Sequence, residues 1–97
     1  MPDNETILEE AQRLVYGDRN KDYGTPLTNH SRTASLYSAY LGIPISPEQV
    51  CYLNILQKIA RGMNAFKRDT ITDIAGYAAN LEMIQNEREI QKPSSQR

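Results

Sequence analysis

The chain has 97 residues, a net charge of −1, and 39% hydrophobic and 24% charged residues. This length fits one domain, and the near-neutral charge argues against a protein that binds duplex nucleic acid, which needs a basic surface. One cysteine and one histidine exclude an intrachain disulfide and a zinc site of the usual type within one chain. No apolar run is long enough to cross a bilayer, so we expect a cytoplasmic protein without a membrane partner.

The first predicted helix covers residues 4–16, and its apolar residues recur at helical spacing: Ile7, Leu8, Ala11, Leu14 and Val15. Asp3 or Asn4 is the expected N-cap, and Gly17 is the expected end of the helix. We interpret Glu10 as a solvated side chain.

The segment that follows, from Gly17 to Gly24, carries more reactive side chains than a simple connection needs. It contains two cations, two carboxylates and one tyrosine: Arg19, Lys21, Asp18, Asp22 and Tyr23. The cations suit phosphate groups, and the carboxylates suit a metal ion or the neighbouring cations. The segment is not a P-loop, because the Gly-Lys-Ser/Thr ending and a preceding strand are missing. It is interpreted as part of a binding site or as a solvated loop whose charges pair with one another.

The second helix is predicted over residues 26–41, with Gly42 at its end. Its apolar stripe includes the single histidine: Leu27, His30, Ala34, Tyr37 and Leu41. We interpret His30 first as a hydrogen-bonded packing residue, and only second as a general base. An exposed apolar edge that joins subunits could form around the end of this helix, from Tyr40, Ile43 and Ile45.

The third helix, over residues 47–62, has the clearest start signal in the chain. Ser46 is a candidate N-cap, Pro47 suits the first helical position, and Gln49 completes a capping box. The apolar stripe of this helix comprises Val50, Leu53, Leu56, Ile59, Ala60 and Met63. Cys51 is interpreted as a small buried hydrophobe rather than a nucleophile.

Polar residues beside these stripes are candidates for ligand contacts. Lys58 and Arg61 are three residues apart and therefore share a helix face. Asn54 and Asn80 are each interpreted as an amide that reads a base or as an inter-helix hydrogen bond.

The fourth helix is predicted over residues 70–90. Asp69 and Asp73 are one turn apart at its start, where negative charge favours helix capping, with Thr70 and Asp73 as a second capping box. The alternative is that the two carboxylates hold Mg²⁺. Gly76 in the helix interior predicts the close approach of a neighbouring helix, with a ligand as the alternative.

These helices and the absence of strand-like alternation predict an all-α, four-helix bundle-like fold. We expect a single domain over residues 1–91 and a frayed polar tail over residues 92–97. Because so small a chain has a marginal core, we also expect a homo-oligomer, with a dimer favoured.

Several motifs within residues 7–84 form a combination: Gly17-Asp18-Arg19, Tyr23-Gly24, Pro26, Asn29, Ser38-Ala39-Tyr40-Leu41-Gly42, Lys58-x-x-Arg61, and Asp69-x-x-x-Asp73-x-Ala75-Gly76-Tyr77. In this combination the chain resembles a small all-helical domain family of phage and prophage genomes that has no assigned function. The resemblance implies a phage-type accessory or counter-defence protein in the cytoplasm of the host cell.

A more distant similarity rests on Lys21-Asp22-Tyr23-Gly24 and on Lys58, Arg61, Asp69, Asp73 and Tyr77. It links the chain to nucleotide-modification-associated helical domains and to all-α NTP pyrophosphohydrolases. The latter bind Mg²⁺ around a triphosphate with helical carboxylates at Glu-x-x-Glu and Glu-x-x-Asp spacing. This chain departs from that pattern, because Gln57, Lys58 and Arg61 stand where the Glu-x-x-Glu pair is expected.

We therefore favour binding of a nucleotide or nucleotide-derived signal, without catalysis and without a cofactor. Such a protein could sequester a host immune signal. The expected ligand contacts are Asp18, Arg19, Lys21, Tyr23, Gly24, His30, Lys58, Arg61 and Tyr77. One alternative is a Mg²⁺-dependent nucleotide pyrophosphohydrolase with Asp69 and Asp73 as metal ligands. The other is an interaction module that binds a host protein and no nucleotide.

Overall fold

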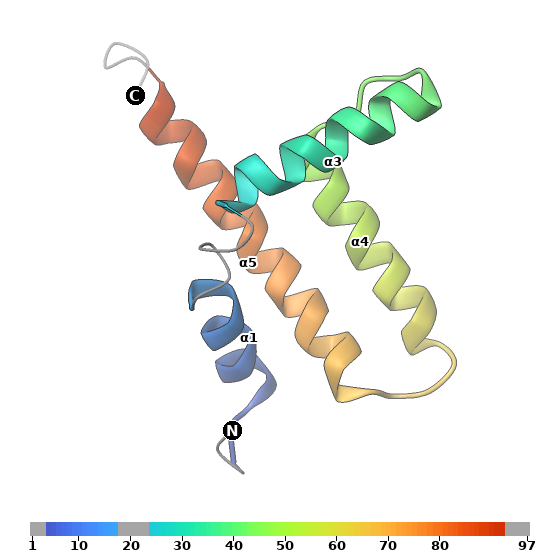
Figure 1. Cartoon of the computed structure of the whole chain (residues 1–97). Helices are drawn as coiled ribbons and strands as arrows, with labels where there is room; N and C mark the ends of the chain where they lie inside the picture. Colours follow the sequence, from blue (N-terminus) through green and yellow to red (C-terminus); the bar gives the residue numbers. More distant parts are fainter. Residues whose placement is uncertain (1–3, 18–23, 93–97) are drawn as a thin grey trace.

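The computed structural model describes residues 4–17 and 24–92. Within these residues every regular element is a helix (Figure 1). The helices are α1 (Ile7–Tyr16), α3 (Pro26–Leu41), α4 (Pro47–Gly62) and α5 (Arg68–Gln91). The predicted all-α fold is thereby confirmed. Helix α5 is the centre of the arrangement and contacts the other three, whereas α1 packs, among the described helices, on α5 alone. None of the described helices is both long and apolar enough to span a membrane.

Three of the predicted helix ends are confirmed. At the start of α4, the Ser46 hydroxyl accepts a hydrogen bond from the Gln49 amide at 3.1 Å, and the Gln49 side chain accepts one from the Ser46 amide at 2.8 Å. Gly42 ends α3 in the left-handed conformation, with φ 72°, which favours glycine. Gly17 ends α1 at a point where a Cβ atom would lie 2.6 Å from the carbonyl oxygen of Arg13.

The predicted cap of α1 at Asn4 is wrong, and Asp3 lies outside the described residues. Thr6 is the N-cap instead, since its hydroxyl accepts a hydrogen bond from the Glu9 amide at 3.1 Å. The Glu9 carboxylate accepts from the Thr6 amide at 2.9 Å, and this bond holds the pKa of Glu9 below its usual value. Thr6 therefore begins a complete capping box, which satisfies two amides that would otherwise lack partners.

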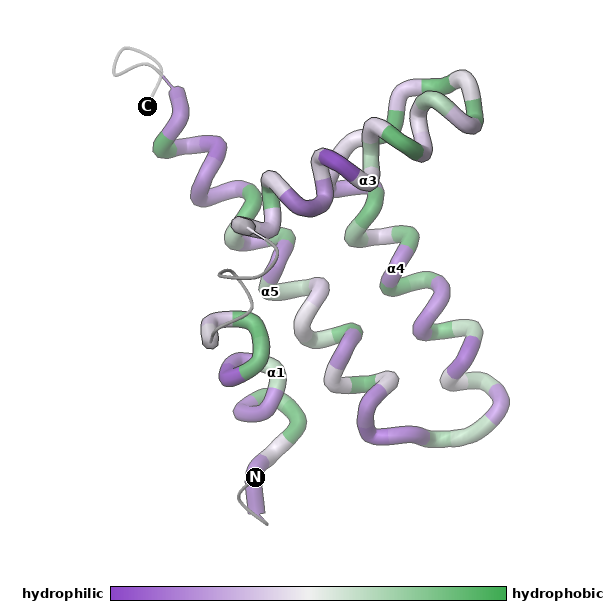
Figure 2. The backbone as a smooth tube through the Cα atoms, in the orientation of Figure 1, coloured by the Kyte–Doolittle hydropathy of each residue, from purple (hydrophilic) through white to green (hydrophobic). Residues whose placement is uncertain are grey.

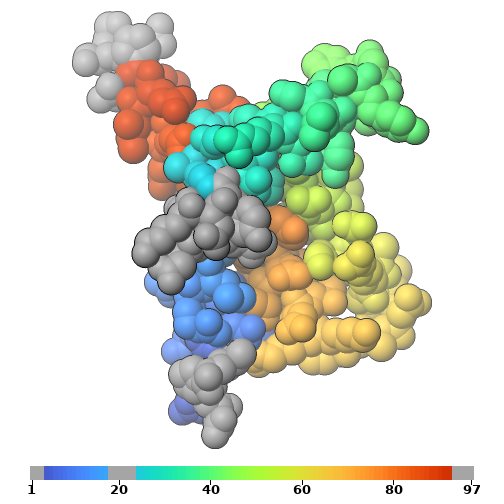
Figure 3. Space-filling model, in the orientation of Figure 1, coloured from blue at the N-terminus to red at the C-terminus, as the bar shows by residue number. Residues whose placement is uncertain are grey.

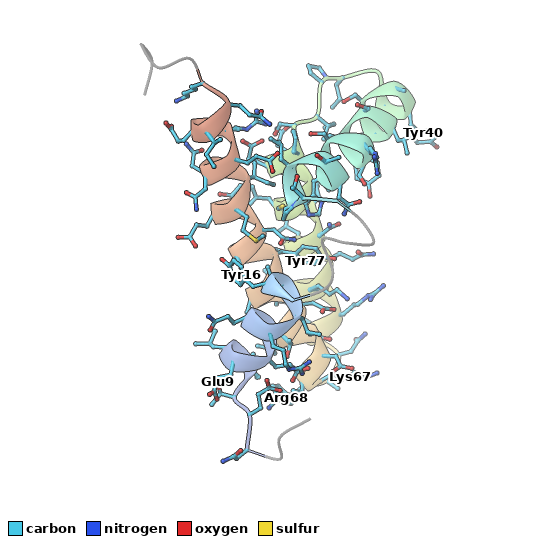
Figure 4. The ribbon with its side chains drawn as sticks, turned by 60° about the vertical axis from the view of Figure 1, so that its left-hand side comes forward. Glu9, Tyr16, Tyr40, Lys67, Arg68 and Tyr77 are labelled. Carbon is cyan, nitrogen blue, oxygen red and sulfur yellow. The ribbon has the colours of Figure 1, made fainter. Side chains whose placement is uncertain are left out.

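The predicted capping box of α5 is also wrong. Helix α5 starts at Arg68, and Lys67, its N-cap residue, makes no side-chain cap bond. Thr70 consequently lies inside the helix and is buried. The first turn is anchored by Arg68, whose guanidinium donates to the carbonyl oxygen of Glu5 at 2.6 Å (Figure 4).

Glu10 is buried rather than solvated, with 6% of the residue exposed. Its carboxylate lies 3.0 Å from Nε of Arg68, so an ion pair joins α1 to the start of α5. Because a partly buried carboxylate needs a partner, this contact explains why the sequence tolerates a charge on the packed side of α1.

The apolar core is small and lies where α3, α4 and α5 meet. Its central cluster consists of Leu27, Cys51 and Ile84, with Leu81 packed against them, and the other buried apolar residues are Ala11, Val15, Ala34 and Val50. Cys51 has no exposed surface, and burial raises the pKa of its thiol to about 11. The interpretation of Cys51 as a buried hydrophobe is confirmed.

The apolar stripe predicted for α4 lies mostly on the surface. Val50 is fully buried, but Leu53, Leu56, Ile59 and Met63 are between 42% and 83% exposed. Figure 2 shows hydrophobic stretches along α4 and at the end of α3, where the helix projects beyond its neighbours. The radius of gyration is 15.0 Å, larger than the roughly 13 Å of a compact chain of 100 residues. The helices thus form an open assembly that leaves much apolar surface uncovered.

Candidate ligand pocket

A pocket with a volume of about 330 Å³ lies between the helices. All four described helices and Gly24 contribute to its wall. Helix α1 supplies apolar side chains, namely Ala11, Leu14 and Val15. The other helices supply mainly polar ones: Asn29, His30, Thr33 and Tyr37 from α3, Asn54 from α4, and Thr72, Asp73, Tyr77 and Asn80 from α5. The pocket is therefore apolar on one wall and rich in hydrogen-bonding groups on the others.

His30 and Asn80 join α3 to α5 across this pocket. The side-chain nitrogen of Asn80 lies 3.2 Å from Nε2 of His30, and His30 is only 5% exposed. The Tyr77 ring meets the imidazole edge-on, with 6.3 Å between the ring centroids and an interplanar angle of 61°. The interpretation of His30 as a hydrogen-bonded packing residue is confirmed, as is that of Asn80 as an inter-helix hydrogen bond. Both side chains also line the pocket.

Asp73 and Lys58 form the charged part of the site. Asp73 lines the pocket, and its Oδ2 lies 2.8 Å from Nζ of Lys58 on α4. Lys58 therefore points toward α5 and not toward bulk water on the outer side of α4. The pair leaves the pocket edge close to neutral, with a cation that an anionic ligand can approach once it competes with Asp73.

Amides and hydroxyls make up most of the remaining polar wall. Asn29, Asn54 and Asn80 each offer a carbonyl oxygen and an NH₂ group, so they can accept and donate hydrogen bonds. The Thr72 hydroxyl donates to the Arg68 carbonyl at 3.0 Å within its own helix. Such a wall suits a neutral, flat group with hydrogen-bonding edges.

The α1 wall approaches α5 at Gly76. A Cβ atom built on Gly76 would lie 3.4 Å from Cγ2 of Val15, which is the limit of ordinary contact. The prediction that a neighbouring helix approaches this glycine is confirmed. Figure 4 shows Tyr77, the next residue, in the region between α5 and the helices packed around it.

The structure brings together some of the predicted site residues. Gly24, His30, Tyr77 and Asp73 line the pocket, and Lys58 adjoins it through Asp73. Arg61 and Asp69 are exposed and are not part of the pocket wall. The four remaining predicted ligand contacts lie outside the described residues: Asp18, Arg19, Lys21 and Tyr23.

The metal-binding hypothesis rests on Asp69 and Asp73, which the structure places in different surroundings. Asp73 is paired with Lys58 in the pocket wall, while Asp69 is exposed in the first turn of α5. Within residues 4–17 and 24–92, no group of three histidine, cysteine or carboxylate side chains is arranged to hold a metal ion.

Sequence reasoning missed part of the pocket wall, notably Asn29, Thr33 and Tyr37. A signal was available in the spacing of α3, because positions 26, 30, 33 and 37 follow one helical stripe. Three of these four residues have polar groups on the side of the helix that also carries core residues. Such a stripe indicates a hydrated or ligand-binding cavity.

Comparison with known proteins identifies a family. A family model described as "Domain of unknown function (DUF6378)" matches residues 6–85, and the chain belongs to this family. No solved structure matches the chain.

Two relatives are both called Gene 55 protein and come from phages. The protein of Mycobacterium phage D29 is 51% identical over 85 residues, which cover 87% of this chain and 56% of the relative. The protein of Mycobacterium phage L5 is 46% identical over 82 residues, which cover 82% of this chain and 53% of the relative. The chain spans about half the length of these curated relatives. The expected resemblance to a small phage family of unknown function is confirmed, while the more distant similarities remain predictions.

Proposed function

We propose that this chain, a member of a phage-represented family of unknown function, binds a nucleotide or nucleotide-derived signal in the pocket without converting it. The observation that carries this proposal is the pocket wall itself, where three asparagine amides and two tyrosine rings line one cavity. Amides pair with the hydrogen-bonding edges of bases, and aromatic rings stack on their faces with little dependence on sequence.

The size of the pocket supports a small ligand. Pockets for small molecules span roughly 300–1,000 Å³, so a volume of about 330 Å³ lies at the lower end. This volume suits one nucleoside-sized group rather than a long chain. A larger signal molecule would place one such group in the pocket and the rest outside it.

Phosphate contacts are proposed for the cations near the pocket. Lys58 lies beside the pocket wall through its pair with Asp73. Arg61 follows one turn later on α4 and is exposed. Arg19 and Lys21 belong to the segment outside the described residues and retain their predicted role as anion contacts. In this proposal the base occupies the pocket interior, and the phosphates lie at the edge, where they compete with Asp73 for Lys58.

Binding without turnover suits a counter-defence role. A phage protein that retains a nucleotide-derived immune signal lowers its free concentration in the host, and hydrolysis is unnecessary for this effect. The relatives in two phages support the phage setting of this proposal.

A thermal-shift screen over nucleoside triphosphates, cyclic dinucleotides and ADP-ribose-derived nucleotides tests the proposal. A ligand at 100 times its dissociation constant stabilises the folded chain by about 2.7 kcal/mol, which raises the melting temperature measurably. For the compound that binds, Asn54→Ala should weaken binding at least tenfold in calorimetry. Asn64→Ala is the matched control, because Asn64 is exposed outside the pocket. If no compound raises the melting temperature, the proposal is wrong and the host-protein alternative gains support.

The enzyme alternative has one observation in its favour, the carboxylate of Asp73 in the pocket wall. In that case Asp73, with Asp69 as the proposed second ligand, would hold Mg²⁺ beside the phosphates. Release of pyrophosphate from a nucleoside triphosphate that requires Mg²⁺ and disappears in Asp73→Asn would establish this alternative and exclude binding without turnover.

A further inference from the structure

Helix α4 has an apolar outer face directed away from α5. We call this face the α4 seam, and it consists of Tyr52, Leu56, Ile59 and Met63, with Leu53 and Ala60 at its flank. The steps along the seam are four, three and four residues, which is the spacing by which helices pack against one another as in coiled coils. The described residues place no helix on it, and every member is exposed.

The charged residues of α4 lie elsewhere on the helix. Lys58 is paired with Asp73 of α5, and Glu48 is paired with Arg88 of α5 at 2.8 Å. Arg61 is exposed but is not in the α4 seam. Because the seam itself carries no charge, a partner with a charged surface would gain no complementary contact there. The seam therefore selects an apolar partner surface.

The end of α3 extends this apolar surface. Tyr40 is 90% exposed and stands at the far end of α3 (Figure 4). Leu36, Leu41 and Ile43 nearby are also exposed. Figures 1 and 3 show that the end of α3 and the length of α4 form the side of the molecule opposite α1.

The area is sufficient for a stable dimer. A large apolar or aromatic residue presents roughly 150–250 Å² when it is fully exposed. Nine such residues from Leu36 to Met63, exposed by 42% or more, and Phe66 beyond them therefore present on the order of 1,000 Å² over the α4 seam and the end of α3. A standard interface needs about 800 Å² on each partner, whereas the largest apolar patch of a monomer is typically about 300–600 Å².

From these observations we infer that a second copy of this chain covers the α4 seam together with the exposed end of α3, with this surface of one copy packed against the same surface of the other. A two-fold axis brings the same apolar residues together from both sides, so the surface is complementary to itself. The second copy is also synthesised together with the first and in equal amount. The apolar surface exceeds the patch typical of a monomer, and the open shape and small core of the single chain agree with a core completed between two chains.

Sedimentation velocity of the full chain at ten to one hundred micromolar tests the inference. The wild type should sediment with twice the chain mass of 11.0 kDa, and its melting temperature should rise with protein concentration. Leu56→Glu should sediment as a monomer and retain its helical circular dichroism. Ile90→Glu is the matched control, since Ile90 is equally apolar and 71% exposed but lies near the end of α5, and it should remain a dimer.

Two results would overturn the inference: a monomeric wild type across this concentration range, or a Leu56→Glu variant that remains a dimer. A monomeric wild type would assign the seam to a different protein. Should Leu56→Glu lose its helicity as well, Leu56→Ala decides, because alanine keeps the helix propensity high. At least tenfold weaker dimerisation of Leu56→Ala supports the inference, and unchanged dimerisation contradicts it.

Discussion

The two faces of α4 have opposite characters. The face toward α5 carries the buried Val50 and Cys51, but also Asn54 and Lys58, which line or adjoin the pocket. The face toward solvent carries the tyrosine, leucine, isoleucine and methionine of the α4 seam. A helix on the surface of a globular protein usually has the reverse arrangement, with its apolar stripe on the core.

This difference indicates a division of tasks within one helix. On the inner face, Val50 and Cys51 take part in the core, whereas Asn54 and Lys58 place polar groups at or beside the pocket. The apolar side chains of the outer face stay in contact with water when a single chain folds, so their burial can stabilise only an assembly. A chain built in this way is expected to gain part of its stability by association, so the two faces can be tested separately.

The largest expected effect separates core from seam. Ile84→Ala removes a fully buried side chain and should lower the free energy of unfolding by about 2–5 kcal/mol at any protein concentration. Leu56→Ala should lower it by an amount that grows with concentration, since the lost contacts belong to the dimer. Urea denaturation at two concentrations measures both. If the loss of unfolding free energy for Leu56→Ala is the same at both protein concentrations, the seam behaves as an ordinary surface.

The thiol of the inner face should make stability sensitive to alkali. The pKa of Cys51 is near 9.0 in an unfolded chain and about 11 when buried, so the folded state retains a proton that the unfolded state releases. The free energy of unfolding should therefore fall between about pH 9 and pH 11, by up to roughly 2 kcal/mol from this group. Cys51→Ala should remove that part of the slope in denaturation measured across this range. If Cys51→Ala and the wild type show the same dependence of unfolding free energy on pH, Cys51 is hydrated in the folded state.

The charged pair on the inner face should matter more for binding than for stability. Lys58→Met breaks the contact with Asp73, which is only partly buried, and should cost less than about 1 kcal/mol of stability. The same substitution should weaken a phosphate-bearing ligand at least tenfold in calorimetry. Lys67→Met is the control, because Lys67 is an exposed cation outside the pocket wall (Figure 4). If both variants bind the ligand equally well, Lys58 is not a ligand contact.

The smallest expected effect concerns the ion pair at the start of α4. Arg88 donates two hydrogen bonds to Glu48, at 2.8 and 2.9 Å, and these hold the pKa of Glu48 below its usual value near 4.5. The contribution of the pair is complete above pH 4.5 and is lost as the pH falls through the lowered pKa. Because the pair is partly exposed, we expect less than about 1 kcal/mol. In Glu48→Gln the free energy of unfolding should fall less steeply as the pH is lowered below 4.5. An unchanged dependence on pH in this range would contradict the assignment.

Local signals predicted the helices well because the atoms that end a helix are close in sequence. The capping box at Ser46 and the glycine ends at Gly17 and Gly42 involve residues within one turn. Where two nearby residues can both cap a helix, as Asn4 and Thr6 can, the sequence alone does not decide which one is the N-cap. The start of α5 depends on Arg68 and its contact with Glu10, which is 58 residues away in the chain.

The pocket was predictable only in part for a related reason. His30 stood out as the single histidine on an apolar stripe and Tyr77 as part of the motif combination, and both line the cavity. The periodicity of α4 identified the stripe from Val50 to Met63 but could not indicate its direction, because spacing is the same for an inward and an outward stripe. That direction depends on which face α5 covers. Asn54 and Lys58 show that α5 covers the more polar one.

The contact between Gly76 and Val15 fixes the distance between two walls of the pocket. A methyl group at position 76 would just fit against Val15, and an alanine there would favour the helix by up to about 1 kcal/mol. A larger side chain would displace α1 outward and carry Leu14 and Ala11 with it. Position 76 therefore sets the separation of two pocket walls from a point on α5, so a single substitution there would enlarge the cavity while every hydrogen-bonding residue is kept.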